Sequence, residues 1–433
     1  MLYYSLNKQS PKVDFKEATL QGQAPDKGLY FPEYIPHLPN NFIKNIISYS
    51  KEEIALQVIQ PYVGDTIPPK ELDEIIAETI DFEFPLVEVV EDKYSLELYH
   101  GPTLAFKDVG ARFMSRCLGY FAKEKKERVI VLVATSGDTG GAVANGFYNV
   151  DGVEVVILYP SGKVSSVQEK QLTTLGNNIH ALEVYGNFDD CQQLVKQAFG
   201  DEEVNKRVSL TSANSINVAR WLPQQFYYLF AYQQWQHLTP PIISVPSGNF
   251  GNICAGILAH ISGLPVKHFI AGCNANDVIP SYLHGGIYEA KKAVSTLSNA
   301  MDVGNPSNFI RILEIFNNEL GNLKNVLTSY SITDEETINI IKQVYEQYNY
   351  LLDPHGAVAY YALQKYLNEH SNEKGIFLET AHPVKFPDCV EHALNKTIDI
   401  PESIAHIMEL EKKATVMPAD YNFLKDYLLK LCC

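Results

Sequence analysis

The sequence predicts an α/β protein built on mostly parallel sheet that helices cover on both faces, with a small accessory domain at the amino terminus. Three observations lead to this class. From Arg128 onward, short runs of apolar, β-branched residues recur, and each is followed by a polar or glycine-containing turn and a helical pattern. Strands that are apolar on both faces and alternate with helices are typical of buried parallel sheets. Before residue 90, short polar helices mix instead with proline-rich turns.

Three regions follow from this change of pattern. We expect an accessory domain over residues 1–90, a main α/β region over 91–400 and a carboxy-terminal helical segment over 401–433. The predicted strands, in chain order, are VIVLVA (129–134), VEVVILY (153–159), HALEVYG (180–186), RVSLT (207–211), PIISVP (241–246), VKHFIAGC (266–273) and GIFLETA (375–381). Because ligands of open parallel sheets bind at the carboxyl ends of the strands, the turns after these runs are the candidate site elements.

Composition and charge exclude several classes of function. The formal charge of −16 is spread over the chain, and no Lys/Arg cluster forms a stripe for nucleic acid or anionic lipid. No stretch approaches the roughly 18 apolar residues of a membrane span, and the amino terminus does not resemble a signal peptide. The seven cysteines form no CxxC pair, which predicts reduced thiols and a cytoplasmic protein, with Cys432 and Cys433 in a frayed tail. No metal-binding or serine-hydrolase motif occurs.

The first candidate site residue is Lys107, in HGPTLAFKDVGARF (100–113). The apolar residues before it and the helical pattern after it would withdraw its amine partly from water. Desolvation favours the neutral amine, which can attack an aldehyde and hold a Schiff base. On the residues alone, the favoured alternative is an exposed lysine paired with Asp108, because isolated lysines are usually solvated.

Two strand-to-helix turns are candidate anion sites. In SGNFGN (247–252), Gly248 and Gly251 could aim successive N–H groups at one anion, as in a phosphate cradle, although a glycine turn that only packs helix on sheet fits equally well. In TSGDTGG (135–141), hydroxyls and helix amides could hold a carboxylate. There Asp138 or Thr139 could also serve simply as the helix N-cap.

Two further loops carry polar groups at the ends of predicted strands. NSINVAR (214–220) combines amide, hydroxyl and guanidinium groups, and Arg220 could bind a phosphate through two parallel hydrogen bonds. The alternative for Arg220 is an exposed ion pair. ETAHPVKF (379–386) presents Thr380, His382 and Lys385, of which the histidine is more often a structural hydrogen-bonding residue than an acid or base.

Taken in this order, GPTLAFKD, ATSGDTGGA, TSANSINVAR, VPSGNFGN, DPHGA and ETAHPVKF resemble the threonine synthase family, and QGQAPDKGLYFP is similar to that family's amino-terminal domain. These separated motifs cover nearly the whole chain and look like the longer bacterial and fungal form. The resemblance implies a tryptophan-synthase-β-like, fold-type II pyridoxal-phosphate enzyme. Residues 91–400 would form two interleaved α/β domains with the cofactor between them.

The resemblance also implies a role for each motif. Lys107 would carry pyridoxal 5'-phosphate as a Schiff base, and Thr380 would face the pyridine nitrogen. The cofactor phosphate would lie on Gly248, Asn249, Phe250, Gly251 and Asn252. The substrate carboxylate would be surrounded by Ser136, Gly137, Asp138 and Thr139, and the substrate phosphate held by Asn214, Ser215 and Arg220. Much of the wider superfamily has asparagine in place of Asp138, so the partner of this carboxylate stays open.

The implied reaction is formation of L-threonine and phosphate from O-phospho-L-homoserine and water, with Lys107 as cofactor anchor and as base at Cα. An O-phosphohomoserine phospholyase making 2-oxobutyrate, or a serine/threonine dehydratase, would have the same fold. The polar set at 214–220 argues against the dehydratase, and only the product separates the phospholyase. A non-catalytic binding protein is disfavoured by the retention of Lys107 and the anion-binding residues.

Overall fold

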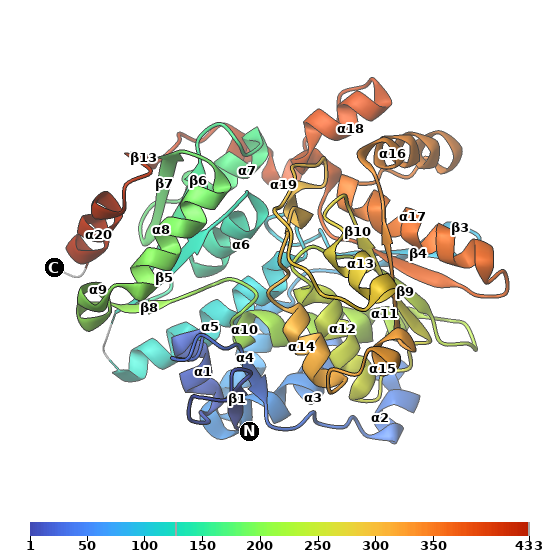
Figure 1. The fold of residues 1–433 in the computed structure, drawn as a ribbon, viewed down its shortest axis with the longest axis horizontal. Coiled ribbons are helices and arrows are strands. Elements are labelled where there is room, and N and C mark those ends of the chain that lie inside the picture. The colour runs from blue at the N-terminus through green and yellow to red at the C-terminus, as the bar shows by residue number, and fades with distance from the viewer. Residues whose placement is uncertain (126–127, 432–433) are drawn as a thin grey trace.

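A computed structural model describes residues 1–125 and 128–431 of the chain. Its fold is carried by two sheets that lie beside each other (Figure 1). One has six strands in the order β11-β10-β9-β12-β4-β3, and the other has five in the order β13-β7-β6-β5-β8. All neighbouring pairs in the two sheets are parallel except β3 and β4. The α/β class with mostly parallel sheet is therefore confirmed.

The strands include all seven predicted runs. The six-stranded sheet consists of β3 (Leu86–Val90), β4 (Lys93–Glu97), β9 (Ile242–Pro246), β10 (His268–Cys273), β11 (Leu327–Ser331) and β12 (Gly375–Glu379). The five-stranded sheet consists of β5 (Val129–Ala134), β6 (Val153–Pro160), β7 (Ile179–Tyr185), β8 (Ser209–Thr211) and β13 (Ala414–Pro418). Strands β5 and β9 are buried along their whole length, which explains their continuous apolar runs.

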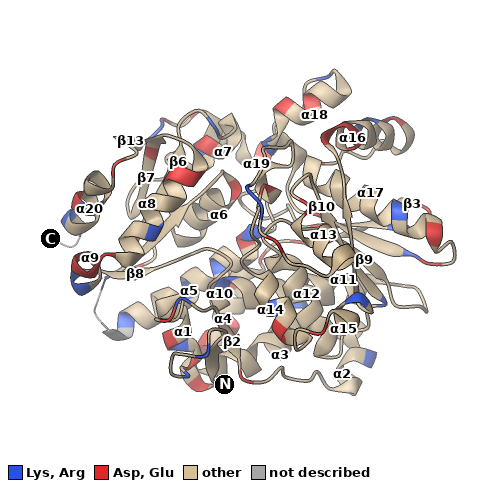
Figure 2. Cartoon of the chain, in the orientation of Figure 1, with Lys and Arg blue, Asp and Glu red and all other residues tan. Residues whose placement is uncertain are grey.

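Helices cover both sheets, and acidic and basic residues lie interspersed over them (Figure 2). Around the six-stranded sheet lie α10 (Val218–Trp221), α11 (Phe226–Gln234), α12 (Gly251–Ile261), α13 (Val278–Gly285), α14 (Phe309–Ile315), α15 (Leu320–Lys324), α16 (Asp334–Tyr348), α17 (Pro354–Glu369) and α18 (Pro387–Leu394). Around the five-stranded sheet lie α5 (Lys107–Lys125), α6 (Asp138–Phe147), α7 (Ser166–Thr173), α8 (Phe188–Gly200), α9 (Glu202–Arg207), α19 (Glu402–Met408) and α20 (Tyr421–Lys430). In the described part of the chain, no helix is long and apolar enough to cross a membrane.

The amino-terminal segment lies beneath the two sheets at the bottom of Figure 1. It consists of the antiparallel pair β1 (Tyr3–Ser5) and β2 (Tyr30–Pro32) with the helices α1 (Phe15–Gln21), α2 (Asn40–Lys44), α3 (Lys51–Val63) and α4 (Pro69–Thr79). Helix α4 packs on α5, and α3 packs on α11. This segment therefore supports the helix that begins with Lys107.

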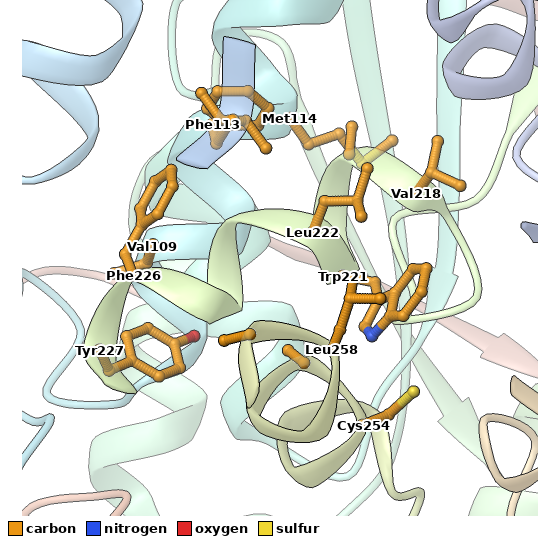
Figure 3. Close-up of a cluster of buried hydrophobic side chains, with 14 of the residues drawn as sticks. Val109, Phe113, Met114, Val218, Trp221, Leu222, Phe226, Tyr227, Cys254 and Leu258 are labelled. Carbon is orange, nitrogen blue, oxygen red and sulfur yellow. The ribbon is translucent and has the colours of Figure 1, made fainter. Parts of the chain in front are cut away.

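One apolar cluster fixes the helices that carry the candidate site (Figure 3). Phe113 of α5, Trp221 of α10, Phe226 of α11 and Leu258 of α12 are each fully buried in it. Burying a side chain of this size contributes about 1.5–3 kcal/mol. Because the four helices are packed through these residues, the positions of their amino-terminal ends are fixed relative to one another.

Residues 401–431 are not helical throughout. Helices α19 and α20 are joined by β13, which pairs with β7 at the edge of the five-stranded sheet. Its side chains do not form an apolar run, because only Met417 is buried. The boundaries at residues 90 and 400 stay predictions, and Cys432 and Cys433 lie outside the described residues.

Candidate active site

The loop before Lys107 is bound along its length to the segment that follows β12. The N–H of Phe106 donates to the carbonyl of Thr380 at 2.9 Å, and the N–H of His382 donates to the carbonyl of Leu104 at 3.0 Å. Leu104 has a positive φ of 58°, which turns the chain toward α5. Two motifs that lie more than 250 residues apart in the sequence are thus held side by side.

Lys107 forms an ion pair with Asp138 and not with its sequence neighbour Asp108. Its Nζ lies 3.2 Å from Oδ2 of Asp138, and its side chain is 15% exposed. Asp108 instead accepts hydrogen bonds from the backbone N–H and the hydroxyl of Thr103. The interpretation of Lys107 as an exposed partner of Asp108 is therefore wrong. Burial, opposed by Asp138 and reinforced by Lys385, lowers the pKa of the Lys107 ammonium.

Asp138, at the start of α6, receives three donors. Besides Lys107, Nζ of Lys385 lies 3.0 Å from Oδ1, and Nε2 of Gln168 donates to Oδ1 at 2.9 Å. Although burial opposes ionisation, the two lysines and the amide hold the pKa of this carboxyl well below its usual range. An ionised carboxylate cannot accept a substrate carboxylate, so only the backbone N–H of Asp138 is suited to that role.

The start of α6 is capped by Thr135, so the expectation that Asp138 or Thr139 caps it is wrong. Oγ1 of Thr135 accepts from the N–H groups of Gly137 at 3.0 Å and Gly140 at 2.9 Å. Within the described residues, the N–H groups of Ser136, Asp138 and Thr139 have no acceptor. These three donors lie at a helix amino terminus, where they favour an anion such as a carboxylate.

A second set of free donors lies between β9 and α12. Among the described residues, none of the five backbone N–H groups from 248 to 252 has a protein acceptor. Phe250 takes the left-handed conformation with φ 62°, and α12 follows immediately with 11 residues. Consecutive amides at the start of a helix of this length form a concave donor set for a phosphate. The alternative, a glycine turn that only packs helix on sheet, does not explain why five N–H groups are free.

The two glycines of this turn are required by close approach and not by unusual dihedrals. Neither Gly248 nor Gly251 has a positive φ. A Cβ on Gly248 would lie 2.5 Å from Cα of Met301, and one on Gly251 would lie 3.1 Å from Cβ of Ser215. Close contact with Met301 and Ser215 is therefore what requires glycine at these two positions, and the left-handed residue of the turn is Phe250.

The loop at 214–220 is bound to this donor set. Oγ of Ser215 accepts from Nδ2 of Asn249 at 3.1 Å and from Nδ2 of Asn308 at 2.9 Å. These bonds leave the hydroxyl proton of Ser215 available to an anion. Asn214 is half-buried, and no described residue contacts its side-chain amide within hydrogen-bonding distance.

Arg220 is buried, and the sequence-based alternative of an exposed ion pair is wrong. Its Nη1 donates to the carbonyl of Lys107 at 2.9 Å, and its Nε has no acceptor among the described residues. Burial lowers the pKa of this guanidinium to about 10, so it stays charged at neutral pH. A buried cation with an unused donor is suited to an anionic ligand.

Several residues of this region were not assigned a role from the sequence. Arg311 is fully buried and donates to the carbonyls of Ser215, Ile216 and Tyr30, which anchors the 214–220 loop to the amino-terminal segment. Gln168 and Lys385 both bind Asp138. The apolar neighbours of Arg311, in FIRILEIF, were the available signal that this arginine is buried.

Two residues near Thr380 differ in their roles. His382 is structural, as its residue type and position predict, because its Nδ1 accepts from the N–H of Val384 at 3.1 Å. Glu379 is fully buried with one oxygen unpaired, and burial together with the neighbouring Asp353 carboxylate raises its pKa well above the usual range. Thr380 is buried, and no described residue bonds to its hydroxyl.

A family model described as "Pyridoxal-phosphate dependent enzyme" matches residues 94–378, which include Lys107, Asp138, the loop at 214–220 and the turn at 248–252. The chain is thus a pyridoxal-phosphate-dependent enzyme of fold type II. Further models, "Threonine synthase N terminus" and "Threonine synthase, C-terminal", match residues 2–80 and 356–428.

Relatives identify the family. The threonine synthase of Escherichia coli (strain K12) is 43% identical over 431 residues, which cover 99% of each chain, and that of Saccharomyces cerevisiae is 35% identical over 98% of this chain and 97% of its own. The chain belongs to the threonine synthase family. Its fold matches the crystal structure of the Escherichia coli enzyme with a TM-score of 0.92 over 100% of both chains, and a PLP-bound threonine synthase from Brucella melitensis with a TM-score of 0.93 at 34% identity and 99% coverage of both. The fold and the threonine synthase family predicted from the sequence are thereby confirmed.

The donor groups of this structure fit the cofactor. Five consecutive free amides lie at the start of α12, which suits a phosphate. A lysine with a lowered pKa suits an aldehyde, and the unpaired hydroxyl of Thr380 suits a ring nitrogen.

Proposed function

We propose that this enzyme acts on O-phospho-L-homoserine and converts it, with water, to L-threonine and phosphate. The observation that carries the proposal is the presence of two regions with free hydrogen-bond donors, which the hydrogen bond between Asn249 and Ser215 joins. The free amides at 248–252 would hold the cofactor phosphate. The second region, Asn214, Ser215 and Arg220, would hold the phosphate of the substrate. A dehydratase acting on serine or threonine would need only the first.

We propose that the substrate carboxylate lies at the start of α6, on the free N–H groups of Ser136, Asp138 and Thr139 and beside Gly137. The carboxylate side chain of Asp138 takes no part in that contact. Two anion sites of this kind, one at each end of the substrate, would fix its carbon chain beside Lys107. Fixed orientation of this sort supplies a large share of enzymatic rate enhancement.

When bound, pyridoxal phosphate supplies an electron sink for negative charge next to the amino-bearing carbon. Lys107 would be its covalent anchor and, once released by the substrate amine, the base that takes the proton from Cα. The phosphate leaves Cγ after a proton is lost from Cβ, and Cγ is then protonated while water adds at Cβ. The lowered pKa of Lys107 favours the neutral amine that this first step needs.

We also infer that the enzyme works in the cytoplasm. The five cysteines in the described part of the chain are buried free thiols. Disulfides are rare in the reducing cytoplasm and common outside it, so this pattern supports that compartment.

The test is a stopped reaction of the cofactor-loaded enzyme with O-phosphohomoserine, in which phosphate, threonine and 2-oxobutyrate are measured together. Equal phosphate and threonine are expected, and Lys107→Ala should abolish both. Lys206→Ala, on the exposed face of α9, is the matched control and should react as the parent enzyme does. Phosphate matched by 2-oxobutyrate would show a phospholyase, and no phosphate would reject this substrate.

A further inference from the structure

Lys385 is a second lysine at the site, and neither anchoring nor substrate binding uses it. It ends the 3-10 helix η5 (Pro383–Lys385) and is fully buried. Its Nζ donates to the carbonyl of Thr103 at 2.7 Å and lies 3.0 Å from Oδ1 of Asp138. A buried ammonium is costly unless it is paired, so its position calls for a reason beyond packing.

Asp138 connects the two lysines through its two different oxygens. Lys385 and Gln168 bind Oδ1, while Lys107 binds Oδ2. The carboxylate is therefore held at one oxygen by two donors that have no part in the proposed chemical steps. Its other oxygen is directed at the amine that must gain and lose a proton.

The charges of Lys107 and Asp138 explain why Lys385 is needed beside them. If Lys107 and Asp138 were alone, loss of the ammonium proton would leave an uncompensated carboxylate in a buried site. That state is strongly unfavourable, so Lys107 would be held protonated and unable to act as nucleophile or base. With Lys385 present, the carboxylate stays compensated whether Lys107 is charged or neutral.

Other ionisable groups lie near the same three side chains. Arg220 adds positive charge beside Lys107, and His355 lies on the α17 side of Asp138. Asp108 lies near Lys385 through Thr103. Neither Arg220 nor Asp108 contacts the carboxylate of Asp138, so they do not replace Lys385 as its partner.

We propose that Lys385 is a positioning residue that acts through Asp138, compensating the carboxylate so that Lys107 can lose its proton while Asp138 stays ionised and fixed beside it. This inference rests on the proposed role of Lys107 as the cofactor lysine. It assigns to Asp138 a task different from binding the substrate carboxylate.

The test compares Lys385→Met and Asp138→Asn in the cofactor-loaded enzyme with two readouts. One is the pH midpoint of the cofactor's absorbance change, and the other is the acid limb of the kcat profile. A charge within about 4–6 Å of an ionisable group shifts its pKa by about 1–3 units, so shifts of about one pH unit are expected. Lys385→Met leaves the Asp138 carboxylate with Lys107 as its only lysine partner. Because the carboxylate then holds the proton on Lys107 more strongly, both readouts should move to higher pH. Asp138→Asn removes the anion and should move both to lower pH.

Control variants separate charge from packing. Lys385→Arg keeps the charge and should restore values close to those of the parent enzyme. Lys365→Met breaks a lysine–carboxylate pair of 3.0 Å with Glu336 outside the site and should shift neither readout. If Lys385→Met does not fold, the nearly isosteric Asp138→Asn still gives the test.

Specific outcomes overturn the inference. They are unchanged readouts in Lys385→Met, shifts of the same sign in Lys385→Met and Asp138→Asn, or unchanged readouts in Asp138→Asn. Failure of the proposed function looks different, because a cofactor absorbance that survives Lys107→Ala would reject the anchor itself.

Discussion

The guanidinium of Arg220 donates a hydrogen bond of 2.9 Å to the backbone carbonyl of Lys107. The residue proposed to hold the substrate phosphate therefore also fixes the residue proposed to hold the cofactor. Phosphate bound at Arg220 would lie close to the start of α5, where the amine of Lys107 acts. This arrangement connects substrate recognition to the position of the base.

We expect Arg220→Lys to raise KM for O-phosphohomoserine at least tenfold, or about 1.4 kcal/mol. Lysine keeps the charge but lacks the planar fork that can bind a carbonyl and a phosphate together. Steady-state kinetics check this, with Arg207→Lys on the exposed α9 as control. A variant of lower thermal stability but unchanged KM would show that Arg220 serves only the fold.

Gly248→Ala should weaken binding of pyridoxal phosphate at least about tenfold, equivalent to about 1.4 kcal/mol. The added Cβ would lie 2.5 Å from Cα of Met301, and backbone must move to admit it. The matched control is Gly200→Ala, where a Cβ meets nothing within 4 Å. Cofactor titration followed by absorbance gives both affinities. Equal affinities in the two variants would contradict the phosphate cradle.

Glu379→Gln should raise the free energy of unfolding, relative to the parent protein, more at pH 8 than at pH 5. The pKa of Glu379 is raised in the folded state by burial and by Asp353, so the fold binds a proton that the unfolded chain releases above about pH 4.3. Stability is therefore lost as pH rises, by about 1.4 kcal/mol for each unit over which the two states differ. The glutamine variant avoids this loss, and denaturant unfolding at both pH values measures it.

The control for this prediction is Glu97→Gln, which should behave in the opposite way. Burial opposes ionisation of Glu97, but its bonds to His100 and Tyr350 lower the pKa below the usual value. Its stabilisation is present above the unfolded pKa and is lost as pH falls through the folded one. Glu97→Gln should therefore destabilise at pH 8, with a smaller effect in acid. The same sign in both variants would contradict the assignment of a protonated Glu379.

Arg311→Met should destabilise the protein by about 3 kcal/mol or more, because three carbonyls lose a buried donor at about 1–3 kcal/mol each. Its guanidinium also lies over the ring of Trp221 at 4.2 Å, a contact that methionine only partly replaces. Since Arg311 binds Tyr30, the amino-terminal segment should become more sensitive to limited proteolysis. An unchanged unfolding midpoint would show that these bonds contribute little.

Much of the site could be predicted because its parts are local. Turns after strands such as β5 and β9 carry free N–H groups wherever a helix follows, and Gly, Ser and Thr at these turns are visible in the sequence. Seven strands of the two sheets were evident from apolar runs, whereas β3, β4, β11 and β13 were not predicted. Strand β13 shows the reason, because an edge strand with one buried side chain has no such run.

The sequence by itself determined the α/β class, the strand-to-helix turns with free N–H groups and, through its motifs, the family. The tertiary structure decided the electrostatic partners: Asp138 with Lys107 and Lys385, and Arg220 with the carbonyl of Lys107. The reason is physical. Periodicity and turn residues report on neighbours in the chain, whereas a pKa depends on charges a few ångströms away in space. Lys385 lies 247 positions after Asp138 in the printed sequence, and only packing of the two sheets brings them together.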